Sequence, residues 1–419
     1  MKVLVVGSGG REHTLVWKIA QSLLVEELYC APGNGGIAGI AQCIAIDAMD
    51  KEGVVKFCKE KSIDMVVVAP DNPLAAGMID ALESAGVRAF GPRKSAAIIE
   101  GSKVFAKELM RKYNIPTADY RVFEDSSESI EYLKASKYPV VIKADGLAFG
   151  KGVIIAQNFE EAYKAIKDIM EDEVFGSAGK RVVIEEFLTG NEVSMLAFTD
   201  GKTIKTMVSS QDHKRALDKD QGPNTGGMGA FSPSKFYTDE IHQYCMDKIY
   251  KTTMDAMNKE GRTFKGILYF GIILTEDGPK VLEYNARFGD PETQVVLPRL
   301  KTDILEIFNA IIDQRLAEIE IEWDDNACVC VIMASGGYPG EYGTGYKIDG
   351  IAEVERDVNT VVFHAGTRLE NGEYYTAGGR VLGVTSLENN LESAAQKAYE
   401  GVFKINFDGM HYRKDIGKK

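Results

Sequence analysis

The chain has 419 residues, of which 45% are hydrophobic and 26% are charged, and because a single core stops growing at roughly 250 to 300 residues, this length predicts several domains. The formal net charge of −13 argues against nucleic-acid binding, which needs clustered basic surface, but it does not exclude small phosphorylated ligands. The six cysteines include no CxxC pair and the five histidines form no HExxH pair, so neither a disulfide framework nor a His/Cys metal site is expected.

Short apolar runs alternate with amphipathic stretches over the first hundred residues, which is the pattern of a parallel βαβ sheet. The sequence therefore predicts a Rossmann-like N-terminal domain over residues 1–101. A further helix is expected over 102–114, with Ser102 as its N-cap. Strands are predicted at 2–7, 27–31, 64–70 and 88–92, and helices at 12–22 and 72–86.

The first strand runs into a glycine-rich loop, VLVVGSGGREH. A dinucleotide fold needs GxGxxG and an acid at the end of the second strand. Gly7 and Gly9 fit, but Glu12 takes the third glycine position, and Cys30 and Ala31 stand where the acid is needed. The pattern leaves two main readings, a tight turn or a loop that holds a small phosphate at a helix N-terminus, and it disfavours NAD.

The sequence pattern then changes to strand–loop–strand at 138–156 and 180–201. This pattern predicts a small α+β lid subdomain over about 115–190. The loop GLAFGKGV fails as a Walker loop, because its spacing is short and Gly152 replaces the Ser/Thr. It could instead close over phosphates as a mobile hairpin through Lys151. Lys143 ends the preceding strand and is well placed to meet a phosphate.

Residues 209–233 form a long polar, glycine-rich stretch with no apolar periodicity, which suits a pocket for a small polar substrate. A helix over about 239–260 and strands at 266–275 and 279–286 complete the expected middle domain, which we place at 102–325. Short strands with glycine-rich turns and a last helix then predict a separate β-rich C-terminal domain over 326–419.

The stretch KVLEYNARFGDPETQ contains the most specific candidates for a chemical role. Residues two apart in a strand share a face, so Glu283 and Asn285 should point together. A carboxylate and an amide oxygen are ligands suited to a magnesium ion that bridges nucleotide phosphates. Arg287 continues the same face and could hold a carboxylate or phosphate with two hydrogen bonds. The pair alone is also compatible with a solvated strand face.

Together these features resemble the ATP-grasp ligases, and within them the phosphoribosylamine–glycine ligase (glycinamide ribonucleotide synthetase) family. The run RFGDPE is specific to that family. The sequence departs from the family pattern only slightly, with Phe149 in the lid and Thr14 after His13 where alanine is usual. The matching stretches cover essentially the whole chain in family order: VLVVGSGGREH, APGNGG, EGSKVFAKELM, VIKADGLAFGKGV, VIEEFLTGNEVS, QDHKR, GPNTGGMGAFSP, VLEYNARFGDPETQVVLPRL and VFHAGT…GGRVLGVT.

The resemblance implies an ATP-grasp fold and ATP-dependent joining of glycine to phosphoribosylamine through glycyl phosphate, in purine biosynthesis. It implies Glu283 and Asn285 as ligands of Mg²⁺ or Mn²⁺, and Asp212, Arg287 and Lys143 as catalytic residues. The implied substrate-binding residues are Gly9, Gly10, Arg11, Glu12, Asn34, Asp212, Arg287 and Asp290. The implied ATP-binding residues are Lys103, Lys143, Gly146, Gly150, Lys151, Gly152, Glu185, Glu186, Phe187, Leu188 and Glu192.

Three other classes are weighed against this one. An NAD-dependent oxidoreductase would need an acidic residue at the end of the second strand, and the sequence has none there. A nucleotide sensor without catalysis would not need Glu283 and Asn285. A different ATP-grasp ligase is the nearest competitor. No nucleic-acid or membrane partner is expected. The chain starts on a strand without a secretory signal pattern, and no stretch approaches 18 apolar residues, so we expect a cytoplasmic protein.

Overall fold

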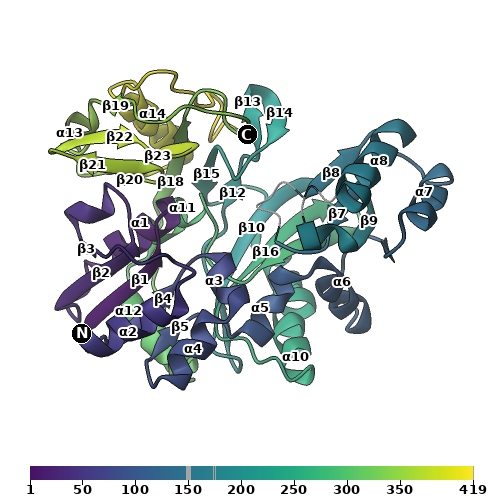
Figure 1. The fold of residues 1–419 in the computed structure, drawn as a ribbon, viewed down its shortest axis with the longest axis horizontal. Coiled ribbons are helices and arrows are strands. Elements are labelled where there is room, and N and C mark those ends of the chain that lie inside the picture. The colour runs from purple at the N-terminus through teal and green to yellow at the C-terminus, as the bar shows by residue number, and fades with distance from the viewer. Residues whose placement is uncertain (148–151, 173, 175, 419) are drawn as a thin grey trace.

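The computed structural model describes residues 1–147, 152–172, 174 and 176–418 (Figure 1). Its N-terminal part is a five-stranded parallel sheet in the order β3-β2-β1-β4-β5, as the alternating pattern predicts. The strands are β1 (Lys2–Gly7), β2 (Glu27–Pro32), β3 (Gln42–Cys43), β4 (Met65–Val68) and β5 (Ala89–Phe90). The α-helices are α1 (Gly10–Ile19), α2 (Lys51–Lys61), α3 (Asp71–Ala76), α4 (Met78–Ser84) and α5 (Lys94–Gly101).

One predicted helix differs from the structure. The stretch 72–86 was expected as a single helix, but it is divided between α3 and α4 at Gly77, which has a left-handed φ of 92°. Glycine enters that region without the steric penalty that other residues have, so the chain can end one helix and start the next there. The turn places Asp71 at the start of α3, beside the site described below.

Two antiparallel four-stranded sheets form the middle of the molecule (Figure 1). One has the order β6-β9-β7-β8 and the other β11-β10-β16-β17. The first comprises β6 (Tyr120–Phe123), β7 (Val140–Ala144), β8 (Val153–Ala156) and β9 (Val182–Glu186), with α6 (Lys103–Lys112), α7 (Ser126–Lys134) and α8 (Phe159–Ile166). The second comprises β10 (Asn191–Thr199), β11 (Ile204–Thr206), β16 (Gly266–Thr275) and β17 (Gly278–Asn285), with α9 (Asp239–Cys245) and α10 (Lys251–Lys259).

The third large sheet has the order β12-β15-β18-β23-β20, and it corrects one expectation. The polar stretch 209–233 was read as a loop, but it contributes β12 (Gln211–Asp212) and β15 (Gly229–Ser232) to the sheet of the C-terminal segment. The sheet of the C-terminal segment therefore includes two strands from the middle of the chain. The strands of the C-terminal segment itself are β18 (Ala327–Ala334), β20 (Thr360–His364) and β23 (Arg380–Glu388), with β19 (Lys347–Ile348), β21 (Thr367–Glu370) and β22 (Glu373–Thr376) in a smaller sheet, and α14 (Leu391–Val402) beside them.

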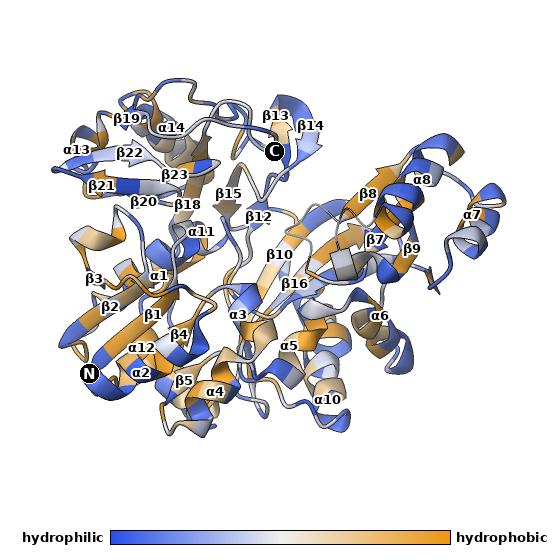
Figure 2. Ribbon diagram, viewed as in Figure 1, coloured by the Kyte–Doolittle hydropathy of each residue, from blue (hydrophilic) through white to orange (hydrophobic). Residues whose placement is uncertain are grey.

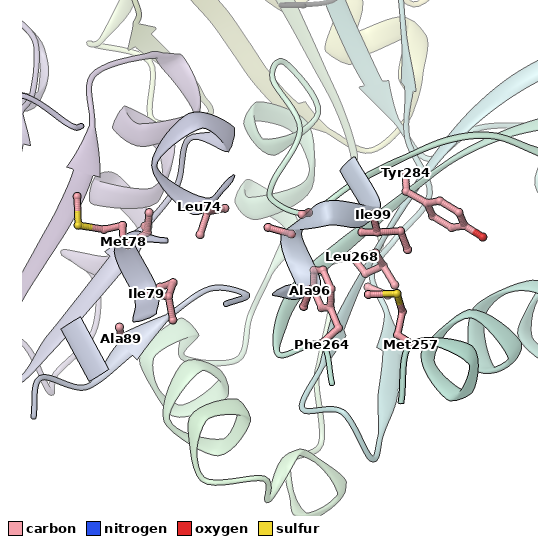
Figure 3. Packing of buried hydrophobic residues seen from close by; sticks show 14 of the residues in the cluster. Leu74, Met78, Ile79, Ala89, Ala96, Ile99, Met257, Phe264, Leu268 and Tyr284 are labelled. Atoms are coloured by element: carbon pink, nitrogen blue, oxygen red, sulfur yellow. The ribbon is translucent and has the colours of Figure 1, made fainter. Parts of the chain in front are cut away.

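Packing joins the N-terminal sheet to the middle of the molecule. The strands of both are rich in apolar residues (Figure 2), and one buried cluster runs from Leu74 and Met78 to Leu268 and Tyr284 (Figure 3). The sheet β6-β9-β7-β8 has a separate core of its own. Because a continuous close-packed core resists relative movement, we expect the N-terminal and β16–β17 parts to act as one body. Among the described residues, no helix is long and apolar enough to cross a membrane.

Candidate active site

A cavity of about 510 Å³ lies where the N-terminal sheet, both middle sheets and the C-terminal segment meet. This volume is in the range of small-molecule sites. Its apolar lining residues include Ile99, Met110, Val153 and Leu282. The charged lining residues are Arg11, Asp71, Glu100, Lys103, Lys107, Lys143, Glu185, Asp212, Lys214, Glu283, Arg287, Asp290, Glu292 and Arg380.

The predicted strand-end pair lies in this lining, because β17 carries both Glu283 and Asn285 to the cavity. Burial raises the pKa of Glu283, but the ammonium groups of Lys214, Lys143 and Lys103 outweigh that effect and hold it below its usual value. The carboxylate is therefore ionised at neutral pH. These two oxygen donors could hold a hard cation.

Arg287 also lines the cavity, although β17 ends at Asn285, two residues before it. Its guanidinium donates to Asn285 Oδ1 at 3.2 Å and pairs with Glu100 at 2.9 Å and with Asp71 at 3.8 Å. Burial alone would lower the pKa of Arg287, but Glu100 and Asp71 raise it above its usual value. The N-terminal domain and α5 thus fix the orientation of this side chain.

Two of the predicted lysines enter the same cavity from different elements. Lys143 on β7 pairs with Glu185 at 3.0 Å and donates to the carbonyl of Leu282 at 3.0 Å. Lys103, at the start of α6, donates to the carbonyl of Gly146 at 2.7 Å, and burial lowers its pKa. Both ammonium groups are therefore positioned for an anionic ligand, with Gly146 and Gly152 also in the lining.

Glu185 has a different environment from the rest of its motif. Its side chain is 2% exposed and lies 3.0 Å from the ammonium of Lys107, as well as from that of Lys143. Burial lowers the pKa of Lys107 to about 8, although Glu185 opposes this. The described cavity does not include the other predicted residues of this region, which are Glu186, Phe187, Leu188 and Glu192. Gly150 and Lys151, with Phe149, lie outside the described residues.

Asp212 on β12 lines the cavity beside Lys214. Burial raises the pKa of Asp212 to about 7; the charge of Lys214 opposes this shift and that of Glu292 reinforces it. Lys214 Nζ lies 3.2 Å from Glu192 and 3.7 Å from Glu283. Burial lowers the pKa of Lys214, but these carboxylates raise it well above its usual value.

The pKa of Asp212 gives a testable pH dependence. Between its ordinary value of 3.8 and about 7, the folded protein binds a proton at this carboxyl that the unfolded chain has lost, so unfolding free energy falls as pH rises through that window. The substitution Asp212→Asn removes this contribution. We expect the free energy of unfolding of the variant, minus that of the wild type, to increase between about pH 5 and about pH 8 in urea titrations. A constant or decreasing difference would contradict a raised pKa for this buried carboxyl.

The opening loop reaches the cavity through Arg11. Glu12 is 2% exposed and accepts hydrogen bonds from the amide of Gly9 at 2.6 Å and from Arg11 Nε at 2.7 Å. The carboxylate of the helix's own third residue therefore caps α1 at the amide where a phosphate was expected. A Cβ added at Gly9 would lie 2.7 Å from Glu12 Oε2, and one at Gly10 would lie 2.7 Å from Gln294 Nε2.

Asn34 joins the second glycine-rich loop to the C-terminal segment. Its amide nitrogen donates to the carbonyls of Ser8 at 2.8 Å and His364 at 2.9 Å, and its oxygen accepts from the amides of Gly36 and Ile37 at 3.0 Å. All of its amide groups are engaged within the chain. In this structure Asn34 holds the loop in place rather than facing the cavity.

Asp290 lies in the cavity lining, in the family-specific run RFGDPE. Its Oδ2 lies 3.0 Å from Arg380 and its Oδ1 accepts from Gln294 at 2.8 Å. Burial raises the pKa of Asp290, but Arg380 and Arg11 outweigh this and lower it. One carboxylate thus meets Gln294 of its own segment and Arg380 of the C-terminal segment.

Sequence reasoning missed several of the charged residues that the fold gathers here. Lys214 stands two positions after Asp212, so the rule used for Glu283 and Asn285 could have selected it. Glu292 accepts from Tyr269 at 3.0 Å and is 4% exposed. The others, Glu100, Lys107 and Arg380, carry no local signal, because only the fold shows which charges of a helix or strand are buried.

Comparison with known families covers most of the chain. Residues 1–100 match the N domain of phosphoribosylglycinamide synthetase, residues 101–293 match its ATP-grasp (A) domain, and residues 328–419 match its C domain. The cavity draws its lining from all three matched regions.

Individual relatives agree with this match. The phosphoribosylamine–glycine ligase of Halalkalibacterium halodurans is 51% identical over 100% of this chain and 97% of its own length. The trifunctional purine biosynthetic protein adenosine-3 of Homo sapiens is 49% identical over 99% of this chain and 42% of its own length. The phosphoribosylamine–glycine ligase structure from Thermotoga maritima has a TM-score of 0.85 and 33% identity, covering 99% of this chain and 100% of that one. A biotin carboxylase domain from Hydrogenobacter thermophilus, crystallised with ADP and magnesium, shares the fold at 17% identity with a TM-score of 0.75.

Proposed function

The chain belongs to the phosphoribosylglycinamide synthetase family, and we propose that its cavity joins glycine to 5-phosphoribosylamine with ATP, forming glycinamide ribonucleotide, ADP and phosphate. It is an ADP-forming ligase of purine biosynthesis. One observation carries the assignment to this cavity: its lining brings together oxygen donors, lysines and other charged side chains from all three matched domains. No Ser/His/Asp or Cys/His set is needed, because phosphoryl transfer depends on positioning and charge neutralisation.

The proposed reaction has two steps. A carboxylate oxygen of glycine attacks the γ-phosphorus of ATP, the bond to the β-phosphate oxygen breaks, and ADP leaves behind glycyl phosphate. The amine of phosphoribosylamine then attacks the glycyl carbon, the carbon–oxygen bond to phosphate breaks, and the amine loses a proton. Each step concentrates negative charge on oxygens, which fixed cations stabilise.

ATP fits the part of the cavity between the two middle sheets. Lys103 and Lys143 would neutralise its phosphates, with Gly146 and Gly152 beside them. The apolar lining residues would suit a base, with the backbone of Glu185, Glu186, Phe187 and Leu188 beside it and Glu192 near the ribose hydroxyls. The buried Lys107–Glu185–Lys143 arrangement supports this, because it fixes the lysine that faces the phosphates.

A divalent cation fits the pair on β17. Glu283 is ionised and Asn285 offers a second oxygen, while the described residues contain no cluster of three or more metal-ligating His, Cys, Asp or Glu side chains. Two protein ligands are what Mg²⁺ or Mn²⁺ needs when substrate phosphates complete its shell. When bound there, the ion would supply positive charge that neutralises the transferred phosphoryl group.

The two smaller substrates would occupy the end of the cavity toward the N-terminal and C-terminal domains. Arg287 offers its guanidinium to the glycine carboxylate, and Asp212 and Asp290 offer carboxylates to the substrate amines. The phosphate of phosphoribosylamine would meet Arg11 and the loop that contains Gly9, Gly10 and Glu12. Asn34 would position that loop through its hydrogen bond to the carbonyl of Ser8.

The test of the proposed function is substrate-dependent ADP release. Phosphoribosylamine generated in the assay from ammonia and ribose 5-phosphate should support ADP formation only when glycine and ATP are both present. Omission of any one of the three should abolish it. ADP release that is indifferent to glycine, or that responds to another acid or amine in a substrate panel, would contradict the assignment.

A further inference from the structure

The stretch between Lys214 and Thr225 forms a small β-hairpin beside the cavity. Its strands are β13 (Arg215–Leu217) and β14 (Gln221–Asn224), and they pair only with each other. Lys214, Asn224 and Thr225 line the cavity, and Thr225 closes the base of the hairpin by donating its amide to the carbonyl of Lys214 at 2.8 Å. The position of Lys214 is therefore tied to this hairpin.

The hairpin has little to hold it by itself. A two-stranded hairpin without further strands is at best marginally stable in water. Leu217 is 48% exposed, and the first three residues of β14 are exposed as well. Its turn contains Lys219 and Asp220, which both have positive φ values, 58° and 54°. Non-glycine residues in that region persist only where neighbouring contacts fix them.

The C-terminal tail supplies those contacts. Figure 1 shows the C-terminus beside β13 and β14. Arg413 is fully buried, and its guanidinium holds Asp415 through two bonds of 2.8 Å. The same guanidinium donates to the carbonyl of Arg215 at 3.1 Å and to Asp220 at 3.0 Å. One buried cation thus joins the tail to the first strand and to the turn of the hairpin.

Two further bonds secure the turn itself. Asp415 accepts the amide of Lys219 at 2.8 Å, and Asp218 accepts the amide of Lys414 at 2.7 Å. Burial lowers the pKa of Arg413, but Asp415 and Asp220 raise it above its usual value. The tail therefore binds the turn at the residues whose left-handed backbone conformation is least favourable without such contacts.

We propose that the C-terminal tail, through Arg413, is a positioning element that holds the hairpin 215–224 and thereby places Lys214 in the cavity. Lys214 lies between Glu192 and Glu283, so its ammonium balances the charge of the proposed metal ligand. Arg413 does not line the cavity and acts only through the hairpin. The kinetic part of this inference rests on the proposed ligase function; the structural part does not.

Hydrogen exchange of the full-length protein tests the structural part without substrate. In Arg413→Gln, amides of residues 215–224 should exchange faster than in the wild type, while those of β16 stay protected. Arg299→Gln is the matched control, because Arg299 is another buried arginine that bonds a backbone carbonyl, of Asp324 at 3.0 Å, and does not contact the hairpin. It should leave the hairpin amides unchanged.

A double-mutant cycle tests the route to the cavity. We expect Arg413→Gln to lower kcat by about tenfold to a hundredfold, because small misplacements of a charged group near the reacting atoms have such effects. In a Lys214→Met background the same substitution should cost less than about twofold, since the two residues act on one another. Arg413→Lys, which keeps the charge, should recover part of the loss.

Faster hydrogen exchange in the hairpin, together with a non-additive mutant cycle, supports the proposal. Unchanged exchange in folded Arg413→Gln, or an equal loss of kcat in both backgrounds, overturns it. If Arg413→Gln does not fold, Asp220→Asn weakens the same pair from the hairpin side by removing the carboxylate charge, at a side chain that is 41% exposed, and the same results decide. A wild-type protein without glycine-dependent ADP release would refute the proposed function and leave the exchange result standing.

Discussion

Glu283→Gln should reduce kcat by at least about a hundredfold to a thousandfold, the size of effect seen when one fixed transition-state stabiliser is removed. The substitution keeps the shape of the side chain but removes the charge that Lys214, Lys143 and Lys103 surround. The fold should remain intact, because this side chain is 37% exposed to the cavity rather than packed in a core. Steady-state ADP release at increasing magnesium concentrations measures both kcat and the apparent metal affinity.

Glu276→Gln is the matched control for this prediction. Glu276 lies in the exposed turn between β16 and β17, on the same hairpin and outside the described cavity. We expect that variant to retain wild-type kcat and magnesium dependence. If Glu283→Gln retained them as well, Glu283 would not be a metal ligand.

The second large effect is expected for Gly9→Val, which should raise the KM for phosphoribosylamine by roughly tenfold to a hundredfold, equivalent to about 1.5 to 3 kcal/mol of charge-assisted hydrogen bonding. An added Cβ would lie 2.7 Å from Glu12 Oε2 and 3.7 Å from Asp290 Oδ2. The branched side chain would therefore displace the carboxylate of Glu12 that caps α1. It would also leave less space for the substrate phosphate beside Arg11. The KM for ATP should stay nearly unchanged, because its proposed site lies around Lys143 and Glu283.

Gly39→Val provides the matched control in the same domain, since a Cβ there meets no atom within 4 Å. It should leave both KM values unchanged. Equal losses of ATP and phosphoribosylamine binding in folded Gly9→Val would place the substrate phosphate elsewhere in the cavity.

Periodicity and capping chemistry predicted much of the fold. Alternating runs indicated the parallel sheet, and Ser102 does cap α6 by accepting the amide of Phe105 at 3.1 Å. The strand β16 coincides with its predicted range. The sequence could not show that β12 and β15 join the C-terminal sheet, because such short strands have no periodicity and β15 pairs with β18, about a hundred residues farther along the chain.

The site divides in the same way. Glu283 and Asn285 follow from the two-residue period of β17, whereas Arg287 lies beyond the end of that strand. Glu100 and Arg380 reach the cavity only through the packing of distant segments, and no local rule distinguishes them from solvated charges. The capping role of Glu12 could have been predicted from its spacing from Gly9, in addition to the proposed phosphate contact of the same loop.

Isotope transfer tests the central claim most directly. Glycine labelled with ¹⁸O in its carboxylate should be incubated with ATP, phosphoribosylamine, magnesium and the wild-type protein, and the released inorganic phosphate analysed by mass spectrometry. If the carboxylate attacks the γ-phosphorus and the amine then displaces phosphate, one ¹⁸O atom should appear in phosphate for each glycinamide ribonucleotide formed. Phosphate without ¹⁸O, alongside product formation, would contradict activation of glycine as glycyl phosphate in this cavity.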